Sequence, residues 1–226
     1  MTHVGSGALM LWIDIDPVVV PEADDWYADE HLPDRIEIGG YQRARRFVAV
    51  DDDTSPRYLS VFEARTPDAL ASDGYLGLVS RISAQSTRIR AAFANVARNT
   101  FALRAATHRA RGGVVAAFRL VATRDADAAR IDALVPRLVR GAVVAASWFE
   151  PAPDVRARMD AHRVTGRDDA SVGPVLLVEA GTPRELGALR AGPLADEAFA
   201  AAGYELQAFG LYRLMADFGP AASVPA

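Results

Sequence analysis

Apolar and polar positions in the first half of the chain alternate with periods that switch between strand and helix. Runs with a two-residue period predict strands at 8–15, 41–50, 57–65 and about 99–107. A period of three to four residues predicts a helix over 22–38. It also predicts one later helix that carries Leu78, Ile82, Ile89 and Phe93 on one face. The resulting order, βαββαβ, is that of a ferredoxin-like unit.

The second half repeats this order. The same periods predict strands at 114–122, 142–150, 174–180 and 205–215, with helices at 127–140 and within 183–202. The segments 61–70 and 177–186 also share Glu, Ala, Thr, Pro and Leu at matched positions, where a strand leads into a helix. A polar stretch at 156–169 interrupts the second copy and reads as a long loop or a short helix. The chain is therefore predicted to contain an internal repeat.

Such a unit covers one face of its sheet with helices and leaves the other face bare. Two units can bury these bare faces against each other. We therefore expect an α+β fold in which two tandem ferredoxin-like βαββαβ units form a pseudo-twofold α/β barrel. The expected boundaries are 1–110 for the first repeat, 111–218 for the second and 219–226 for a flexible tail.

The amino-acid composition excludes some kinds of catalysis but does not identify a reaction. The 226 residues include no cysteine, and all 25 basic residues are arginine, so thiolate chemistry and lysine Schiff bases are excluded. A net charge of −4 argues against a nucleic-acid partner. No apolar run approaches the ~18 residues of a membrane span. We expect a cytoplasmic protein whose partner is a small molecule, with homo-oligomer formation left open.

Two neighbouring segments carry a family resemblance. Trp-Tyr-Ala-Asp-Glu-His-Leu-Pro-Asp-Arg at 26–35, followed by Gly-Tyr-Gln-Arg-Ala-Arg-Arg-Phe at 40–47, resembles the EthD-like group of the dimeric α/β-barrel superfamily. The resemblance implies a barrel that relatives usually build from two chains. It implies no single reaction, because the superfamily includes cofactor-free monooxygenases, isomerases, dehydratases and haem enzymes. Since the second half lacks the Glu-His motif, the functional site is expected in the first half alone.

Comparison of the two halves singles out His31. Aligning Pro33 with Pro136 places His31 opposite Leu134, which belongs to an apolar helix stripe predicted to face the sheet. A partly buried imidazole suits a general acid or base, because small effects move its pKa across neutrality. The alternative is a structural histidine that packs and donates to a backbone carbonyl. With the resemblance, the two interpretations have equal weight.

Side chains near His31 complete the predicted site. Asp34 and Glu30 are the candidates for orienting the His31 ring and count with it as catalytic residues. Tyr27, four residues before His31, shares its helix face, and Tyr27 and Trp26 are expected to line the cavity or support the helix.

Arginines on the following strand are the predicted substrate-binding residues. Arg43 and Arg45 point to one face of the strand at 41–50, whereas the matching strand of the second half carries no charge over 143–149. If that face lines the barrel cavity, their planar guanidinium groups could hold an acidic or phenolic ligand. Alternatively, they lie on an exposed edge or pair with acidic residues of the preceding helix.

Two classes of function remain open at this level. The first is a small-molecule enzyme that performs cofactor-free proton transfer or related chemistry on an apolar or aromatic metabolite. The alternative is a non-catalytic small-molecule-binding or vestigial barrel, and haem binding follows only from the superfamily. The sequence does not decide whether the protein is an enzyme. No metal site is predicted, because no second histidine follows His31 at zinc-helix spacing.

Overall fold

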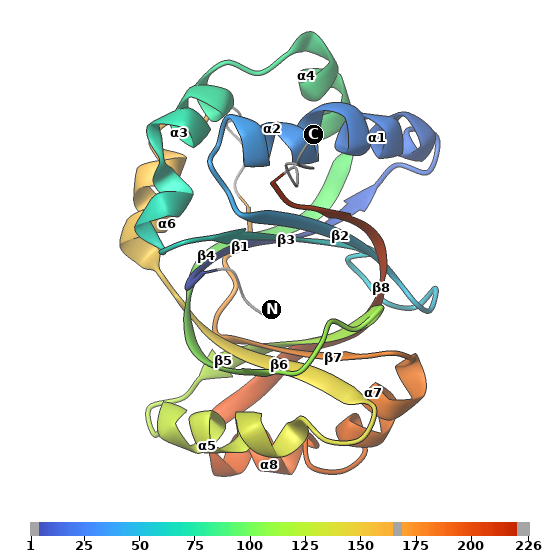
Figure 1. Ribbon diagram of the computed structural model, residues 1–226, viewed down its shortest axis with the longest axis vertical. Helices are drawn as coiled ribbons and strands as arrows, with labels where there is room; N and C mark the ends of the chain where they lie inside the picture. Colours follow the sequence, from blue (N-terminus) through green and yellow to red (C-terminus); the bar gives the residue numbers. More distant parts are fainter. Residues whose placement is uncertain (1–4, 165–168, 221–226) are drawn as a thin grey trace, which may run out of the picture.

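Antiparallel strands close into one barrel in the computed structural model, which describes residues 5–164 and 169–220 (Figure 1). The strands are β1 (Gly7–Ile15), β2 (Arg43–Ala49), β3 (Tyr58–Ala64), β4 (Phe93–His108), β5 (Val114–Ala122), β6 (Val143–Pro151), β7 (Val175–Ala180) and β8 (Tyr204–Phe218). Their order around the barrel is β1-β3-β2-β8-β5-β7-β6-β4. The first four strands therefore run β4-β1-β3-β2 and the last four β8-β5-β7-β6, which is the same arrangement. The predicted α+β barrel fold is confirmed.

Helices cover the two opposite outer sides of this barrel (Figure 1). On the first-half side lie α1 (Val20–Trp26), the π-helical turn η1 (Tyr27–His31), α2 (Leu32–Glu37), the 3₁₀ turn η2 (Asp68–Ala71), α3 (Asp73–Ser80) and α4 (Ala84–Ala91). On the second-half side lie α5 (Ala128–Leu138), α7 (Pro183–Arg190) and α8 (Asp196–Ala201). None of the described helices is long and apolar enough to cross a membrane.

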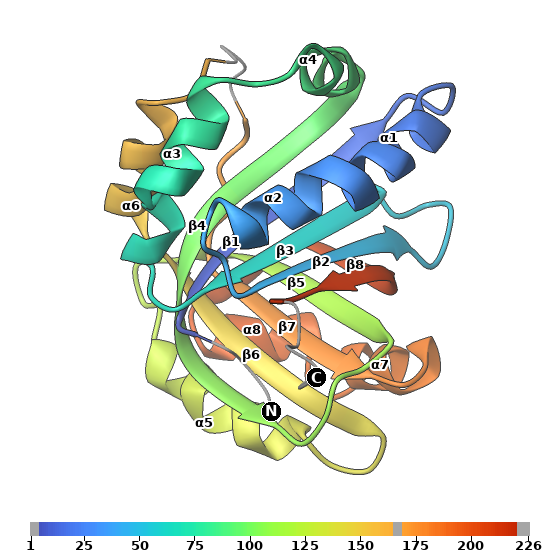
Figure 2. The ribbon, with the colours of Figure 1, turned by 45° about the horizontal axis from the view of Figure 1, so that its top comes forward.

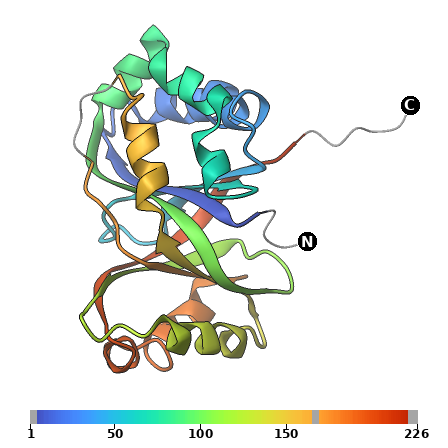
Figure 3. The same ribbon diagram turned by 90° about the vertical axis from the view of Figure 1, so that its left-hand side faces the viewer.

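The helix α6 (Pro153–Asp160) crosses to the opposite side of the barrel from its own half. It overlaps the start of the polar stretch at 156–169 and lies beside α3, as Figures 1 and 3 both show. Val155 and Met159 are buried in the apolar cluster between the first-half helices and their sheet. The second half therefore contributes structure to the first-half side.

The single helix predicted to carry Leu78, Ile82, Ile89 and Phe93 is wrong. Arg81 leaves the helical conformation, with φ −139° and ψ 85°, and ends α3. The hydroxyl oxygen of Ser83 accepts a hydrogen bond from Ser86 N at 2.9 Å and caps a new helix, α4. Phe93 is the first residue of β4. The serine cap offers the backbone an alternative to continuing the helix, which the apolar period alone does not reveal.

The inside of the barrel is filled by side chains. Residues from both halves meet there in one buried cluster, whose largest members are Trp12, Phe47, Phe101, Phe149 and Tyr212. A void of about 10 Å³ beside the buried pair Arg45 and Glu63 is too small for an organic ligand. A metabolite-sized site therefore has to lie elsewhere.

The expected boundary between the repeats falls at residues 109–113, which connect β4 to β5. Within the predicted tail, residues 221–226 lie outside the described residues.

Candidate functional site

A cavity of about 490 Å³ lies between the first-half sheet and the helices that cover it. Its apolar wall comes from strands and helices and consists of Leu9, Leu11, Phe62, Tyr75, Val79, Ile82, Ala91, Phe93 and Val96. Its polar lining consists of His31, Arg35, Thr87, Arg90, Arg98, Arg163 and Asp169. The lining residues come from the region where α2, α3 and α4 cover β1, β3 and β4, an arrangement of elements that Figure 2 shows. The volume is within the range of about 300–1,000 Å³ that is usual for small-molecule sites.

His31 ends the π-helical turn that interrupts the helix predicted over 22–38. The backbone N–H of Leu32 donates to the carbonyl of Tyr27, five residues earlier instead of four. Pro33 gives the physical reason, because its ring would clash with the carbonyl of Asp29 in a regular α-helix and it has no N–H to donate there. The wider turn accommodates the proline and leaves His31 in the cavity wall, 7% exposed. Such turns occur frequently at functional sites.

Aromatic rings surround the His31 imidazole. The ring centroid of Trp26 lies 4.3 Å away and that of Tyr27 lies 5.0 Å away. Phe62 of β3 meets the imidazole edge-on at 5.9 Å between centroids. Within the described part of the chain, neither ring nitrogen has a hydrogen-bond partner, so the backbone hydrogen bond expected of a structural histidine is not present there.

Burial holds the pKa of His31 well below its usual 6.5, and the cationic side chains of Arg35, Arg90 and Arg46 lower it further. The imidazole is therefore neutral at pH 7 and has a lone pair available. This favours a proton acceptor over a proton donor.

Replacing His31 with leucine is expected to remove an acid-dependent loss of stability from the ligand-free protein. The unfolded state binds a proton to His31 below pH 6.5, whereas the folded state does not until its lower pKa is reached. The free energy of unfolding should therefore fall by about 1.4 kcal/mol for each pH unit in that interval. Above pH 7 this contribution is complete.

Urea unfolding of the wild type and His31→Leu between pH 5 and 7.5 measures this effect as the difference between two curves. Replacement of the exposed His162 by leucine is the control. A difference that stays constant with pH would contradict a buried neutral imidazole.

Two cavity arginines already have carboxylate partners. The Nε of Arg98 donates to Asp169 at 2.9 Å, and the Nη1 of Arg163 donates to the same Asp169 oxygen at 2.6 Å. Arg98 also pairs with Asp160, at the end of α6. This network joins β4 to the segment that follows α6 and closes one side of the cavity.

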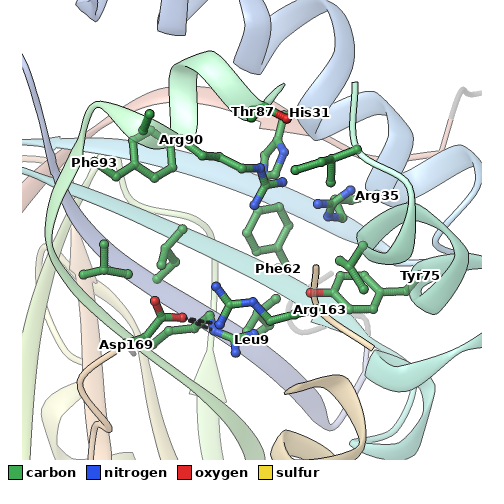
Figure 4. A pocket seen from close by; sticks show the side chains of 16 residues that line it. Leu9, His31, Arg35, Phe62, Tyr75, Thr87, Arg90, Phe93, Arg163 and Asp169 are labelled. Atoms are coloured by element: carbon green, nitrogen blue, oxygen red, sulfur yellow. Dashed lines mark hydrogen bonds and ion pairs between the residues drawn. The ribbon is translucent and has the colours of Figure 1, made fainter. Parts of the chain in front are cut away.

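Arg35 and Arg90 differ from these two, because no described residue forms an ion pair with either. Arg35 is 6% exposed, and its guanidinium lies over the ring of Tyr75 at 5.2 Å. Arg90 lies over Trp26 at 5.5 Å, and its buried Nε has no hydrogen-bond partner among the described residues. Burial, together with the charge of Arg35, lowers the pKa of Arg90 to about 10. Figure 4 shows both guanidinium groups beside Phe62, with His31 next to Arg90.

Glu30, a predicted catalytic residue, does not contact His31. It connects the π-helical turn to α4 through hydrogen bonds. Its carboxylate accepts hydrogen bonds from Ser83 Oγ at 3.0 Å and from Ser86 Oγ at 2.8 Å. The indole N–H of Trp26 donates to the same Ser86 oxygen at 3.1 Å. Trp26 therefore packs behind the imidazole and does not line the cavity.

Tyr27 and Asp34 also lie outside the cavity lining. Tyr27 is buried against His31, and the guanidinium of Arg46 lies 3.9 Å from the centre of its ring. Asp34 is partly buried, and no hydrogen bond joins it to His31 among the described residues. The structure thus brings Trp26 and Tyr27 to His31 as supports, but it gives neither Asp34 nor Glu30 an orienting contact.

The predicted substrate-binding arginines, Arg43 and Arg45, do not reach this cavity. Arg43 pairs with Asp217 of β8 through two hydrogen bonds of 2.6 Å. Arg45 points into the barrel, one of the two orientations that the sequence left open, and pairs there with Glu63 and Glu179. The expectation assumed that a ligand cavity lies inside the barrel, whereas it lies between sheet and helices.

Several lining residues were missed at the level of sequence. Arg35 had a signal, because it ends the quoted motif four residues after His31. For Arg90 the only signal in the sequence was its position in a segment predicted to be helical. Arg163 and Asp169 come from the polar stretch of the second half, so the expectation of a site built from the first half alone is corrected. Among the described residues, no group of acidic or histidine side chains is arranged to hold a metal ion.

Comparisons with known proteins identify the fold. No family model and no curated protein matches the sequence. Among solved structures, an anthrone oxidase-like protein matches with a TM-score of 0.59 at 13% identity, over 97% of this chain and 95% of its own. A candidate monooxygenase from Fusobacterium nucleatum gives 0.57 at 8% identity, over 96% of both chains. A haem-binding protein from Thermus thermophilus gives 0.56 at 12% identity, over 94% and 92%. At these identities the likeness extends to the fold alone.

Proposed function

We propose that this chain, whose fold is that of the dimeric α/β-barrel proteins, binds an apolar metabolite in the His31 cavity and removes a proton from it without a cofactor. The observation that carries the proposal is the neutral imidazole, free of hydrogen bonds to the described residues, in the wall of a 490 Å³ cavity with mostly apolar walls. A general base requires a free lone pair within reach of its substrate.

The environment of His31 limits which protons it can take. Its low pKa makes it a weak base, so the substrate needs an acidic C–H next to a carbonyl group, or a phenolic O–H. In the step, the C–H or O–H bond breaks, the proton moves to the imidazole, and the electron pair remains on the substrate as an enolate or phenolate. The cationic Arg35 and Arg90 favour that anion. They also destabilise the imidazolium, which promotes return of the proton to the product.

Hydrogen–deuterium exchange of an apolar carbon acid tests the proposal. With 2-tetralone as the probe, proton NMR should show exchange of its acidic C–H groups faster with the wild-type protein than in buffer alone. His31→Leu should reduce the protein-dependent rate by about 10²–10⁴-fold, the usual contribution of a general base. Its melting temperature should stay similar or rise, because a buried polar ring is removed.

The exposed His162 supplies the control, and His162→Leu should exchange at the wild-type rate. Equal rates for wild type and His31→Leu would refute proton transfer by His31. Binding of apolar ligands without any accelerated exchange would favour the non-catalytic alternative.

Haem binding is the second candidate, since one structural neighbour is described as a haem-binding protein. Among the described residues that line the cavity, His31 is the one histidine, so it would be the residue that holds the haem iron. The charges of Arg35 and Arg90 suit propionate groups. A haem titration followed by visible spectroscopy distinguishes the candidates. A Soret band that is present in the wild type and lost in His31→Leu would favour haem over proton transfer.

A further inference from the structure

Arg35 and Arg90 are two cations in the cavity wall that form no ion pair with any described residue. We infer that they form the recognition site for a carboxylate group on the ligand, so that the cavity selects apolar, aromatic acids over neutral molecules of the same shape. The inference deepens the proposed function and rests on it only in placing the ligand in the same cavity.

Cationic side chains outnumber carboxylates in the lining of the cavity. Four arginines and one carboxylate, Asp169, line it. Asp169 is already bonded to Arg98 and Arg163, and its side chain is 1% exposed. Glu30, an acidic side chain on the π-turn, is occupied by serine hydroxyls on α4. The second oxygen of Asp169 has no hydrogen-bond partner among the described residues, and Asp34 and Glu30 act on Arg35 and Arg90 only as more distant charges. No carboxylate among the described residues forms an ion pair with Arg35 or Arg90.

Both guanidinium groups lie in the cavity wall without an ion-pair partner in the described part of the chain, which has an energetic cost. Removing a charge from water without a partner is costly, and two like charges near each other add repulsion. The aromatic faces of Tyr75 and Trp26 offset part of this cost through cation–π contact, but they do not satisfy the N–H donors. An arginine binds a carboxylate through a planar pair of N–H groups, which satisfies both charge and donors. The missing partner is thus an oxyanion.

The remaining wall specifies the rest of the ligand. In Figure 4 the two guanidinium groups lie beside the ring of Phe62, and apolar side chains line the space on either side. A carboxylate between Arg35 and Arg90 would leave the ligand body against Leu9, Phe62 and Phe93. A phosphorylated or sugar-like ligand would place many polar groups against this wall without hydrogen-bond partners. The fitting class is an acid with one or two aromatic rings.

Calorimetric titration with 2-naphthoate and its neutral counterpart 2-naphthamide tests the inference directly. The two probes have the same ring system and differ in charge at one group. At pH 7.5 the wild type should bind the acid at least tenfold more tightly than the amide. Arg35→Met and Arg90→Met should each reduce this ratio to about one, chiefly by weakening the acid.

Arg88→Met is the matched control. Arg88 lies on the same helix as Arg90 but is exposed and paired with Glu22, so the acid-to-amide ratio should stay at the wild-type value. The melting temperatures of ligand-free Arg35→Met and Arg90→Met should be equal to or above that of the wild type, because each change removes a cation without an ion-pair partner among the described residues, buried in the case of Arg35 and partly buried in the case of Arg90. Should either variant fail to fold, Arg35→Lys and Arg90→Lys keep the charge but lose the fork, and an intermediate ratio is then expected.

Equal affinity of the wild type for acid and amide, or an unchanged ratio in both methionine variants, would overturn the inference. His31→Leu separates it from the proposed function, since that variant should keep the preference for the acid. If the wild type prefers 2-naphthoate but does not accelerate exchange of 2-tetralone, the proposed proton transfer is refuted and the carboxylate site is supported. If exchange of 2-tetralone depends on His31 but 2-naphthoate binds no more tightly than 2-naphthamide, proton transfer is supported and the carboxylate site is refuted.

Discussion

Replacing Arg45 with leucine is expected to lower the free energy of unfolding by about 3–5 kcal/mol, the usual effect of breaking a buried ion pair by removing one partner. Arg45 is 4% exposed and lies between Glu63, 2% exposed, and Glu179, 7% exposed. Its Nη1 donates to Glu179 at 2.7 Å and its Nη2 to Glu63 at 3.2 Å. Without the guanidinium, two carboxylates remain inside the barrel without that cation.

The reason lies in which strands meet inside the barrel. Glu63 and Glu179 occupy matched positions of the two similar segments, and both point into the barrel, so one cation from β2 joins a carboxylate from each half. Burial alone would lower the pKa of Arg45, but the charges of Glu179 and Glu63 raise it above its ordinary value. The backbone N–H of Gly112, in the connection between the halves, donates to the second Glu179 oxygen at 3.1 Å.

Urea unfolding at pH 7.5 measures the effect, with Arg43→Leu as the control. Arg43 forms a partly exposed pair with Asp217, so its loss should change stability by only about 0–1 kcal/mol. Adding Glu63→Gln to Arg45→Leu should restore part of the loss, because one buried carboxylate disappears. Equal effects of the two arginine replacements would contradict a special role for the interior cluster.

Residues 1–110 expressed alone are expected to self-associate or to be insoluble, because we propose that each repeat is a unit whose bare sheet face needs the other. The inner face of the first-half sheet carries Met10, Trp12, Phe47, Leu59 and Phe101, all fully buried in the whole chain. Exposed apolar patches larger than about 400 Å² are rarely tolerated in soluble monomers.

Co-expression of 1–110 with 111–226 should rescue the fragment as a soluble one-to-one complex, since β2 pairs with β8 and β4 pairs with β6 across the two halves. Light scattering after size-exclusion chromatography gives the masses. A folded monomer of 1–110 would refute the proposed division into repeats, and the separately purified full chain provides the reference mass.

Much of the fold was predictable because it depends on local patterns. The strand predicted at 114–122 coincides with β5, and the stripe through Ile131, Val135 and Leu138 is buried against its sheet. The sequence also predicted that Arg45 and Phe47 share one face of β2, since side chains alternate strictly along a strand, but it left open whether that face points into the barrel. The division into α3 and α4 was missed, because a serine cap competed with an apolar period that continues through it.

The candidate site was predictable only in its centre. His31 could be singled out because the second copy has leucine at the matched position, which places both on the helix face toward the sheet. The partners predicted for it were wrong in part. Glu30, expected to orient the His31 ring, accepts hydrogen bonds from serines at α4, and Arg45, expected to bind the substrate, pairs with the two glutamates inside the barrel. Pairing between charges depends on distances between segments far apart in the chain, and no periodicity records them.

By itself, the sequence indicated the α+β barrel and the positions of most strands, the lack of thiol and lysine side chains, and the histidine on a helix face otherwise expected to be apolar. The tertiary structure alone decided that the barrel is filled while the space under α2, α3 and α4 is open. It also decided that Asp169 pairs with Arg98 and Arg163 and leaves Arg35 and Arg90 without an ion-pair partner among the described residues. The physical reason is that periodicity follows from backbone geometry within one element, whereas cavities and charge pairs arise from how elements pack against one another.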